Sequence, residues 1–371
     1  MKNKYSLLDE VNFIDNKSVY YKKKYPISYI KLKILKLYER LRKYPKGIVS
    51  LNTNNKIDFL IKFYACNKAG FITLLSNHNS RLKLSKEKLK INYFFWKNKF
   101  VKISSKKENL NKNTSIILKT SGSTSEQKYV LISNKVISFI TKQMNIEMYK
   151  NIRNCSELIF APCDHAFGFL RIHALMVSQN SLSFTQDINL TKLFDTYRIS
   201  KSDAISINSQ ILKAAMDVNY VFFKRNFKNI KYFQVSSGFF PTQYRKKILK
   251  FGANIFINYG MTEAMRTTFL NCKKFPQKIH TEGKPFNGVN IKIKKKNNSE
   301  ILVKGKNLAI SYLNKKTWKS KLENGWFKTG DIGKLDKQNF LIFNGRNVDN
   351  VNFNGFNYSL KKIENLIKKK F

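Results

Sequence analysis

The chain has 371 residues, of which 42% are hydrophobic and 14% aromatic. This length is more than one compact domain usually holds, and the composition excludes intrinsic disorder. The formal net charge is +47. Such a charge would suit binding to a polyanion or to an anionic substrate. It could also reflect compositional drift, because most of the excess charge comes from Lys, and the uncharged residues Asn and Ile are abundant as well. The basic residues are scattered and form no arginine-rich arm, so drift is favoured and specific nucleic-acid binding is not expected.

The cysteines and the chain start point to a reducing compartment. Cys66, Cys155, Cys163 and Cys272 lack the spacing of a zinc or redox site, so each is expected to be a buried free thiol. The start of the chain lacks the apolar core of a signal peptide, and no stretch reaches the roughly 18 apolar residues of a membrane helix. A cytoplasmic protein without a transmembrane segment is expected.

The first elements form a βαβ pattern. Apolar residues at helical spacing predict a helix over residues 27–43, and residues 47–51 predict a short strand. A second helix is predicted over residues 57–69, with Gly70 as its C-terminal stop, before a strand over residues 71–75. This alternation predicts a parallel sheet.

Four further apolar strands each lead into a loop of polar and small residues. They are predicted at residues 115–118, 158–160, 232–235 and 255–257. Ligands of open α/β sheets bind beyond the carboxyl ends of the strands. We therefore expect the functional site in these four loops.

The pattern changes after about residue 286. Short alternating runs at residues 289–293, 300–303 and 339–343 predict a small antiparallel β subdomain, with turns at Asn297-Asn298 and Asn324-Gly325. A lysine-rich amphipathic helix is predicted over residues 359–371. No internal repeat or long linker is present.

The loop over residues 120–128 has the composition of a phosphate site. Hydroxyl residues and Gly supply many short hydrogen-bond donors, and Lys128 adds a positive charge. The alternative is an ordinary Ser/Thr/Gly turn, since the loop is not a Walker motif. Its candidate ligand residues are Thr120, Ser121, Gly122, Ser123, Thr124 and Lys128.

Two other motifs carry groups suited to a nucleotide. In residues 258–263, Tyr259 could lie on an adenine, Thr262 could donate to a phosphate, and Glu263 is an oxygen ligand suited to Mg²⁺. In residues 325–331, Asp331 is predicted at a turn where it could accept from both ribose hydroxyls, and Arg346 supplies a nearby cation. Each motif taken alone could equally be a solvated turn.

Together, in this order and spacing, the motifs resemble the adenylate-forming superfamily of acyl-CoA synthetases, luciferase and peptide-synthetase adenylation domains. The matching segments run along nearly the whole chain. They are residues 59–71, 120–128, 162–169, 237–238, 259–263, 283–285, 325–331, 345–346 and 355–364.

The resemblance implies a fold and a division of the chain. The fold would be α/β, with layered α/β/α subdomains of mostly parallel strands, a small β-barrel-like subdomain, and a C-terminal small domain that is largely missing. The implied segments are an N-terminal α/β subdomain with the phosphate loop, a second α/β subdomain, a small antiparallel β subdomain and a remnant of the small domain, at residues 1–200, 201–286, 287–346 and 347–371.

The resemblance also implies a two-step reaction. A carboxylate attacks the α-phosphate of MgATP to give acyl-AMP, and a thiol of CoA or carrier-protein pantetheine then takes the acyl group. Residues 120–124 and Lys128 would hold pyrophosphate, Thr262 the α-phosphate and Glu263 the Mg²⁺. The adenosine would be bound by Ser237, Gly238, Asn258, Tyr259, Gly260, Asp331 and Arg346.

The acid pocket is expected in residues 162–169. His165 falls on the aromatic-gate position of acyl- and aryl-activating members, and Phe167 and Phe169 would line an apolar pocket. This favours a hydrophobic or aryl acid over an amino acid. The alternative is that His165 caps a helix or is a satisfied core residue.

Several positions depart from the family pattern. Ser125 and Gln127 stand where the loop usually has Gly and Pro, Val348 occupies the hinge position, and Leu360 and Lys362 replace Pro and Glu. The family continues for roughly a hundred residues beyond the position of Phe371, and that lobe carries a catalytic lysine. Three readings follow: an acid-activating lobe that works alone or with a separate C-terminal lobe, a degenerate ATP- or acyl-AMP-binding protein, or a polyanion-binding protein on the same fold.

Overall fold

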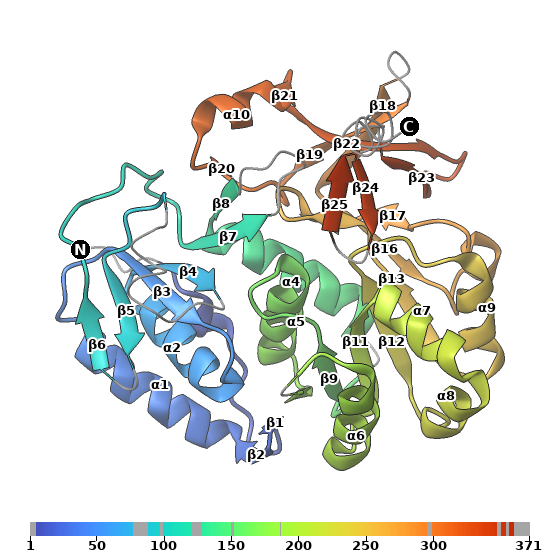
Figure 1. Ribbon diagram of the computed structural model, residues 1–371, viewed down its shortest axis with the longest axis horizontal. Coiled ribbons are helices and arrows are strands. Elements are labelled where there is room, and N and C mark those ends of the chain that lie inside the picture. Colours follow the sequence, from blue (N-terminus) through green and yellow to red (C-terminus); the bar gives the residue numbers. More distant parts are fainter. Residues whose placement is uncertain are drawn as a thin grey trace, which may run out of the picture.

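The computed structural model describes residues 5–76, 88–96, 99–120, 128–149, 152–185, 187–294, 299–346, 350–353 and 356–359. Two large sheets carry most of the chain, and helices α4 and α5 lie between them (Figure 1). A smaller antiparallel sheet sits at one end, above both (Figure 1). The predicted α/β class with mostly parallel sheets and a separate small β unit is confirmed.

The larger sheet has nine strands. β1, β10, β9, β11, β12 and β13 run parallel, and antiparallel strands close its edges. In spatial order the strands are β17 (Lys284–Pro285), β16 (Thr268–Asn271), β13 (Asn254–Ile257), β12 (Tyr232–Ser236), β11 (Ala204–Asn208), β9 (Ser156–Phe160), β10 (Ser181–Phe184), β1 (Ser18–Tyr21) and β2 (Lys23–Pro26).

The second sheet has seven strands. β3 and β4 are parallel, as the βαβ pattern predicts, and β5 and β7 join them in the same direction. In spatial order the strands are β20 (Ser311–Tyr312), β8 (Lys128–Ile132), β7 (Ile116–Thr120), β4 (Ile72–Ser76), β3 (Ile48–Asn52), β5 (Tyr93–Trp96) and β6 (Lys99–Lys102).

The small sheet is antiparallel, as predicted. Its strands are β18 (Val289–Lys294), β19 (Glu300–Gly305), β22 (Trp326–Leu335), β21 (Leu322–Glu323) and β23 (Leu341–Arg346). Asn324 and Gly325 both have positive φ, 50° and 79°, which is the conformation that a two-residue hairpin between β21 and β22 requires. Two hairpins stand apart: β14 (Gly260–Met261) with β15 (Met265–Arg266), and β24 (Asn350–Phe353) with β25 (Phe356–Ser359).

The helices begin and end close to the predicted positions where the sequence signals are strong. Asn55 caps α2 through its side chain, and Gly70 follows the helix with φ 83°. The helices are η1 (Leu7–Glu10), α1 (Ile27–Leu41), α2 (Lys56–Lys68), α4 (Asn134–Tyr149), α5 (Ala166–Val177), α6 (Leu190–Ser200), α7 (Ser209–Val218), α8 (Tyr220–Asn226), α9 (Thr242–Lys250), η2 (Pro276–Lys278) and α10 (Lys315–Ser320).

Helix α5 is buried along almost its whole length, from Phe167 to Met176. Its first turn packs closely on the loop that leaves β9. A side chain on Gly168 would place its Cβ 2.2 Å from the carbonyl oxygen of Pro162, so glycine is required there. This close approach fixes where the start of α5 projects its side chains.

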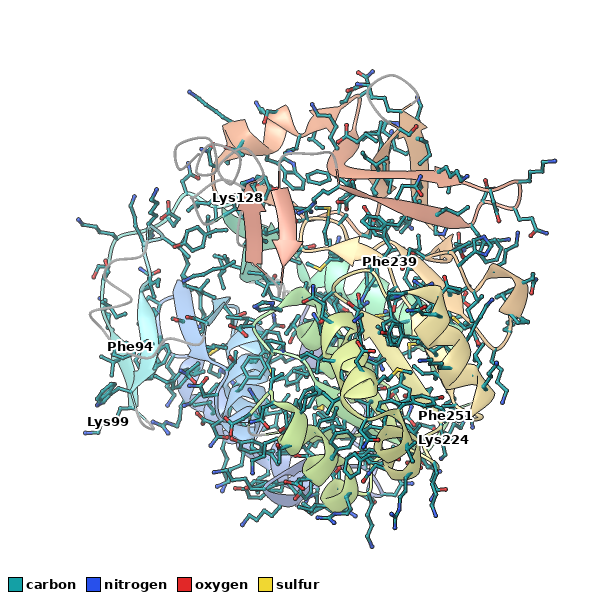
Figure 2. All side chains as sticks on the ribbon, turned by 45° about the vertical axis from the view of Figure 1, so that its right-hand side comes forward. Phe94, Lys99, Lys128, Lys224, Phe239 and Phe251 are labelled. Atoms are coloured by element: carbon teal, nitrogen blue, oxygen red, sulfur yellow. The ribbon has the colours of Figure 1, made fainter. Side chains whose placement is uncertain are left out.

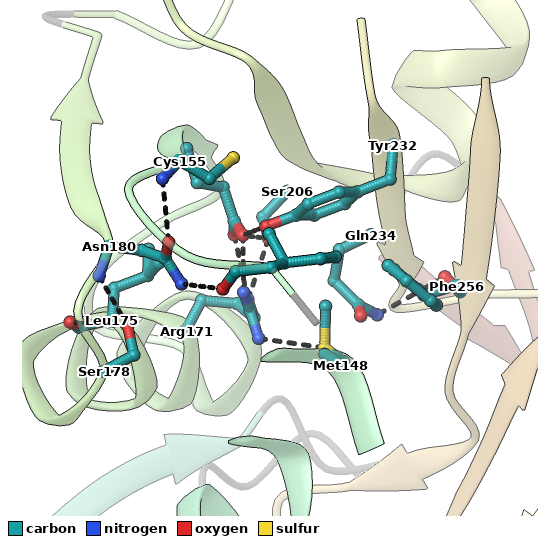
Figure 3. A network of polar contacts seen from close by, with 12 residues as sticks. Met148, Cys155, Arg171, Leu175, Ser178, Asn180, Ser206, Tyr232, Gln234 and Phe256 are labelled. Carbon is teal, nitrogen blue, oxygen red and sulfur yellow. Dashed lines mark hydrogen bonds and ion pairs between the residues drawn. The ribbon is translucent and has the colours of Figure 1, made fainter. Parts of the chain in front are cut away.

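A buried polar network joins α5 to the nine-stranded sheet (Figure 3). The Arg171 guanidinium donates to both carboxylate oxygens of Glu157 at 3.0 and 2.6 Å, and Tyr232 donates to the same carboxylate at 2.6 Å. Arg171 also contacts the sulfur of Met148 at 3.3 Å. Burial raises the pKa of Glu157, but Arg171, Ser206 and Tyr232 outweigh it and hold that pKa below its ordinary value.

All four cysteines are buried free thiols, as expected. In the described residues no helix is long and apolar enough to cross a membrane. The predicted boundaries between segments at residues 200, 286 and 346 stay predictions. The nine-stranded sheet takes strands from the first and the second segment alike. Of the predicted C-terminal helix, residues 360–371 lie outside the described residues, and Ser359 ends strand β25.

Candidate active site

The loops that leave three strands of the nine-stranded sheet meet around one cavity. β9 leads into the start of α5, β12 ends at Ser236, and β13 leads into the β14–β15 hairpin. The cavity has a volume of about 110 Å³. It is lined by His165, Ala166, Phe167, Leu170, Ser236, Ser237, Gly260, Met261, Thr262, Met265 and Arg266. The expectation that strand-end loops gather at one site therefore holds for these three strands.

The β14–β15 hairpin presents Thr262 and Glu263 in a three-residue loop. Gly260 faces the returning strand so closely that a Cβ there would lie 1.8 Å from the carbonyl oxygen of Met265. The backbone N–H of Ala309 donates to the carbonyl of Glu263 at 2.8 Å, which ties the loop to the segment before β20. The loop is thus held by backbone contacts on both sides.

The Glu263 carboxylate is buried and engaged by Tyr312 of β20. The Tyr312 hydroxyl donates to Oε1 of Glu263 at 2.6 Å. Burial, together with this carboxylate, raises the pKa of Tyr312, so its hydroxyl stays a proton donor. The Nζ of Lys128 lies 5.4 Å from the centre of the same ring. Figure 2 labels Lys128 on the side of the molecule where the small sheet lies.

A second lysine belongs to this cluster. Burial and the positive charge of Lys128 lower the pKa of Lys321, which follows α10. Two lysines beside one carboxylate leave excess positive charge at this place. Such an arrangement is suited to the phosphates of a nucleotide.

Tyr259, Asp331 and Arg346 form a separate cluster. The Tyr259 hydroxyl donates to Oδ2 of Asp331 at 2.8 Å, and Nε of Arg346 donates to Oδ1 at 2.8 Å. Burial raises the pKa of Asp331 in spite of the opposing charge of Arg346. The prediction that Asp331 sits at a turn is wrong. It lies inside the ten-residue strand β22, which bends at Gly330 with φ 76° and then continues into pairing with β23.

The other predicted nucleotide residues follow strands β12 and β13. Ser237 and Gly238 follow β12 with φ of 64° and 129°, and Ser237 lines the cavity. A Cβ on Gly238 would lie 2.7 Å from Oγ of Ser209. The Asn258 side chain is buried and donates to the carbonyl of Thr268 at 2.8 Å, so it braces the start of the hairpin.

The predicted acid-pocket residues separate into two groups. His165 is exposed at the N-terminal end of α5, makes no capping hydrogen bond with its side chain, and lines the cavity together with Phe167. Phe169 does not line it. The Phe169 ring packs edge-on against the Phe63 ring of α2, with 5.0 Å between the ring centres. The predicted role of Phe169 in the acid pocket therefore has no support in the geometry. Residues two apart on a helix point to opposite faces, which explains the separation.

Only the two ends of the predicted phosphate loop can be described. Thr120 pairs with Lys128 across strands β7 and β8, and Oγ1 of Thr120 is buried without a described hydrogen-bond partner. Ser121, Gly122, Ser123 and Thr124, with Ser125 and Gln127, lie outside the described residues, and so does Val348. The roles assigned to these residues stay predictions.

Three site residues were missed from the sequence: Tyr312, Lys321 and Arg266. The first two reach the site through β20 and α10, and nothing in their local sequence indicates pairing with β8. Arg266 lies only three residues after Glu263, and an arginine in the returning arm of a hairpin was a signal that could have been used.

The described residues hold no cluster of three His, Cys, Asp or Glu side chains suited to a metal ion. Glu263 alone still fits Mg²⁺ at a nucleotide site, because that ion is commonly bound by one or two carboxylates together with phosphates and water. Its carboxylate is oriented by the Tyr312 hydroxyl.

Comparison with known proteins agrees with this geometry. The family model described as AMP-binding enzyme matches residues 75–313, which is more than half of the chain. The chain belongs to the AMP-binding enzyme family. The resemblance of the sequence motifs to adenylate-forming enzymes is thereby confirmed.

The curated relatives of this chain include ligases that match a part of their own length. The 2-succinylbenzoate–CoA ligase of Lactococcus lactis is 28% identical over 256 residues, which is 68% of this chain and 54% of that protein. The same ligase of Bacillus subtilis is 24% identical, over 68% of this chain and 53% of that protein. The chain thus spans about half the length of these curated relatives.

Two examples illustrate the solved structures that share the fold. The o-succinylbenzoate CoA synthetase of Bacillus subtilis, bound to a product analogue, has a TM-score of 0.79 at 19% identity, covering 97% of this chain and 82% of that one. The amide bond synthetase of Marinactinospora thermotolerans also has a TM-score of 0.79, at 13% identity, covering 98% and 83%. At these identities the likeness establishes the fold alone.

Proposed function

We propose that the protein activates a carboxylic acid with ATP, forming acyl-AMP and pyrophosphate, and transfers the acyl group to a thiol. One observation carries the proposal: the continuous segment of residues 258–266 joins three groups. It supplies Tyr259 to the Asp331–Arg346 cluster, Glu263 to the Tyr312–Lys128 cluster, and Thr262 to the cavity. A nucleotide that lies along this segment would place its ribose at the first cluster and its phosphates at the second. The acid, in the cavity, would then lie at the same edge of the sheet.

Each cluster has a distinct part in this proposal. Lys128 and Lys321 bind phosphate oxygens, and Thr262 donates to the α-phosphate where the acid carboxylate attacks. Glu263 would hold Mg²⁺, which would supply positive charge against the charge that develops on the phosphates. The Asp331 carboxylate accepts hydrogen bonds from the ribose hydroxyls, while Arg346 holds that carboxylate in place. The contribution of the protein is mainly positioning and charge neutralisation.

The class of the acid is proposed from the residues that line the cavity, and the acceptor is proposed from the similarity to known ligases. The cavity behind Thr262 is lined by Phe167, Leu170, Met261 and Met265, which favours an apolar or aryl acid over an amino acid. The curated relatives named above act on 2-succinylbenzoate and use CoA. CoA is therefore the first acceptor to test, followed by a pantetheine-bearing carrier protein. A separate C-terminal lobe acting with this chain is proposed as a partner. A cytoplasmic location also stays a proposal.

Carboxylate-dependent exchange of pyrophosphate into ATP tests the proposal. The acids are octanoate, suberate, benzoate, 2-succinylbenzoate and phenylalanine. We expect exchange with at least one of the non-amino acids, and a fall of about 100-fold in Glu263→Gln, because a charged group that stabilises the transition state is lost. Exchange that is absent with every acid while ATP still binds would contradict the proposal.

Glu323→Gln is the matched control. Glu323 lies on β21, is partly exposed, and pairs with Lys294 at 2.6 Å outside the cavity. The same change of charge there should leave exchange unaltered. Equal losses in the two variants would mean that Glu263 acts only through net charge.

A further inference from the structure

Arg266 is a wall residue of the cavity that the proposed reaction does not use. It lies on β15 opposite Gly260 and is 2% exposed. Its guanidinium carbon lies 4.5 Å from the centre of the Phe167 ring, and Phe167 lines the same cavity. Arg266 therefore stands on the α5 side of the cavity, whereas Thr262 lies in the loop of the hairpin.

The Arg266 guanidinium has no hydrogen-bond acceptor among the residues that the structure describes. Its Nε, Nη1 and Nη2 are all buried, and no described residue accepts from any of them. A guanidinium carries five N–H donors, and buried charges in proteins are nearly always paired because desolvation is costly. The contact with Phe167 offsets only a part of this cost.

Another buried arginine shows the usual arrangement. Arg245 on α9 donates to the carbonyls of Phe240, Ile279 and Thr281 at 2.6, 3.0 and 2.6 Å, and to Glu282 at 2.5 Å. Arg171 is likewise paired with Glu157 (Figure 3). Among these three buried arginines, Arg266 stands apart in lining the cavity and in lacking an acceptor.

The charges around Arg266 do not balance. Arg171 and Glu157 are the charged groups that act on it, the first unfavourably and the second favourably. The Glu157 carboxylate already accepts from Arg171, Ser206 and Tyr232. Within the described part of the chain, two guanidinium groups therefore lie near one carboxylate, which leaves a net positive charge beside the cavity.

We propose that Arg266 binds a second acidic group of the acid substrate, so that the substrate is a diacid rather than a monoacid. The inference rests on the proposed function, since it concerns the acid that the same cavity takes. A planar guanidinium pairs with a carboxylate through two parallel hydrogen bonds, which would supply both the missing acceptors and the missing negative charge. The apolar residues that line the same cavity then contact the part of the substrate that joins its two acidic groups.

Binding of matched acids, without ATP, tests the subsite directly. Suberate and octanoate have the same number of carbons and differ by one carboxylate. 4-Oxo-4-phenylbutanoate is 2-succinylbenzoate without the carboxylate on its ring, so this second pair also differs by one carboxylate. Calorimetry and ligand-induced shifts in melting temperature should show the diacid of at least one pair binding about tenfold or more tightly than its monoacid. In Arg266→Met this preference should disappear.

Variant stability separates a binding role from a structural one. Arg266→Met removes an unpaired buried charge and should leave the melting temperature of the free protein unchanged or raise it. Arg245→Met, the matched control, removes a fully paired guanidinium and should lower the melting temperature strongly. Because any dianion is attracted to a chain of net charge +47, only the loss of preference in Arg266→Met counts as support.

Three results would overturn the subsite. One is equal affinity for diacid and monoacid in both pairs. Another is a diacid preference that survives in Arg266→Met. The third is a loss of ATP or AMP affinity in that variant without any change in acid affinity, which would assign Arg266 to the phosphates. A diacid preference without pyrophosphate exchange would keep the subsite and contradict the proposed reaction, so the two failures are distinguishable.

Discussion

The hydroxyl of Tyr312 is the smallest group on which the proposed phosphate site depends. It donates to Glu263 from a strand that enters the site from the seven-stranded sheet. Its ring meanwhile packs edge-on against Trp318 at 5.2 Å and faces Lys128. The ring of Tyr312 therefore contributes to packing, and its hydroxyl orients Glu263, the proposed metal ligand.

Tyr312→Phe should separate these two functions. A hydrogen bond to a charged group is worth about 1.5–3 kcal/mol, so we expect a loss of exchange rate of roughly 10- to 100-fold. The Mg²⁺ concentration for half-maximal exchange should rise, while the melting temperature changes little. Tyr244→Phe is the control, because the Tyr244 hydroxyl donates to Asp217 at 2.5 Å outside the cavity lining. An unchanged Mg²⁺ requirement in Tyr312→Phe would contradict the positioning role.

At the scale of elements, α5 connects the cavity to a second buried polar cluster near its other end. His173 of α5 is fully buried, shares a hydrogen bond of 2.9 Å with the Tyr64 hydroxyl, and has Nε2 3.5 Å from the Glu10 carboxylate. Glu10 also accepts from Ser138 at 2.6 Å and pairs with Lys142 at 2.7 Å. η1, α2, α4 and α5 are thus joined around one histidine.

This cluster makes stability depend on pH. Burial lowers the pKa of His173, so the folded chain keeps it neutral while the unfolded chain takes up a proton below about pH 6.5. The unfolded state then binds more protons, and the free energy of unfolding falls as the pH drops from 7 to 5, by at most about 1.4 kcal/mol per pH unit.

Urea denaturation at pH 5, 6 and 7 measures this dependence. His173→Gln should flatten it, and His280→Gln, a change at an exposed histidine, should not. Identical slopes in the parent protein and His173→Gln would show that other groups cause the dependence. Glu10 contributes stability throughout this range and loses it only at lower pH. Burial raises the pKa of Glu10, but hydrogen bonds from His173, Lys142, Ser138 and Tyr5 outweigh burial and hold that pKa below its ordinary value. The contribution of Glu10 to the free energy of unfolding is therefore lost below about pH 4.

At the scale of the whole molecule, local patterns predicted the elements better than their partners. The βαβ unit, the strands β9, β12 and β13, and the polar loops after them were all predictable from periodicity and turn residues. The joining of β1 and β2 to the nine-stranded sheet was not, nor was that of β20 to the seven-stranded sheet. Pairing between strands distant in the sequence leaves no local signal, and for this reason Tyr312 and Lys321 were missed.

Two site predictions depended on geometry that spacing does not reveal. Phe167 and Phe169 flank one glycine in the sequence, yet the helix directs one to the cavity and the other to Phe63. Asp331 was predicted at a turn, whereas β22 bends at Gly330 and continues through Asp331. Burial of Arg266 and its lack of an acceptor can be recognised only from the packed structure.

The net charge of +47 is spread over the molecule rather than collected at the site. Nitrogen-tipped side chains project around the whole outline in Figure 2. The site contributes a few cations, Lys128, Lys321 and Arg346 among them, and these have described contacts or neighbours of opposite charge. The specific contacts of the site, rather than the total charge, are therefore the basis for the proposed recognition of ATP.

Transfer of oxygen from the acid to AMP tests the central claim most directly. An acid that supports exchange is labelled with ¹⁸O in its carboxylate and incubated with MgATP and CoA, and the AMP is analysed by mass spectrometry. Attack by the carboxylate on the α-phosphate, followed by cleavage of the acyl–oxygen bond by the thiol, leaves one ¹⁸O in AMP. We predict labelled AMP from the parent protein and almost none from Glu263→Gln. Unlabelled AMP, formed at the same rate with or without the acid, would contradict acid activation at this site.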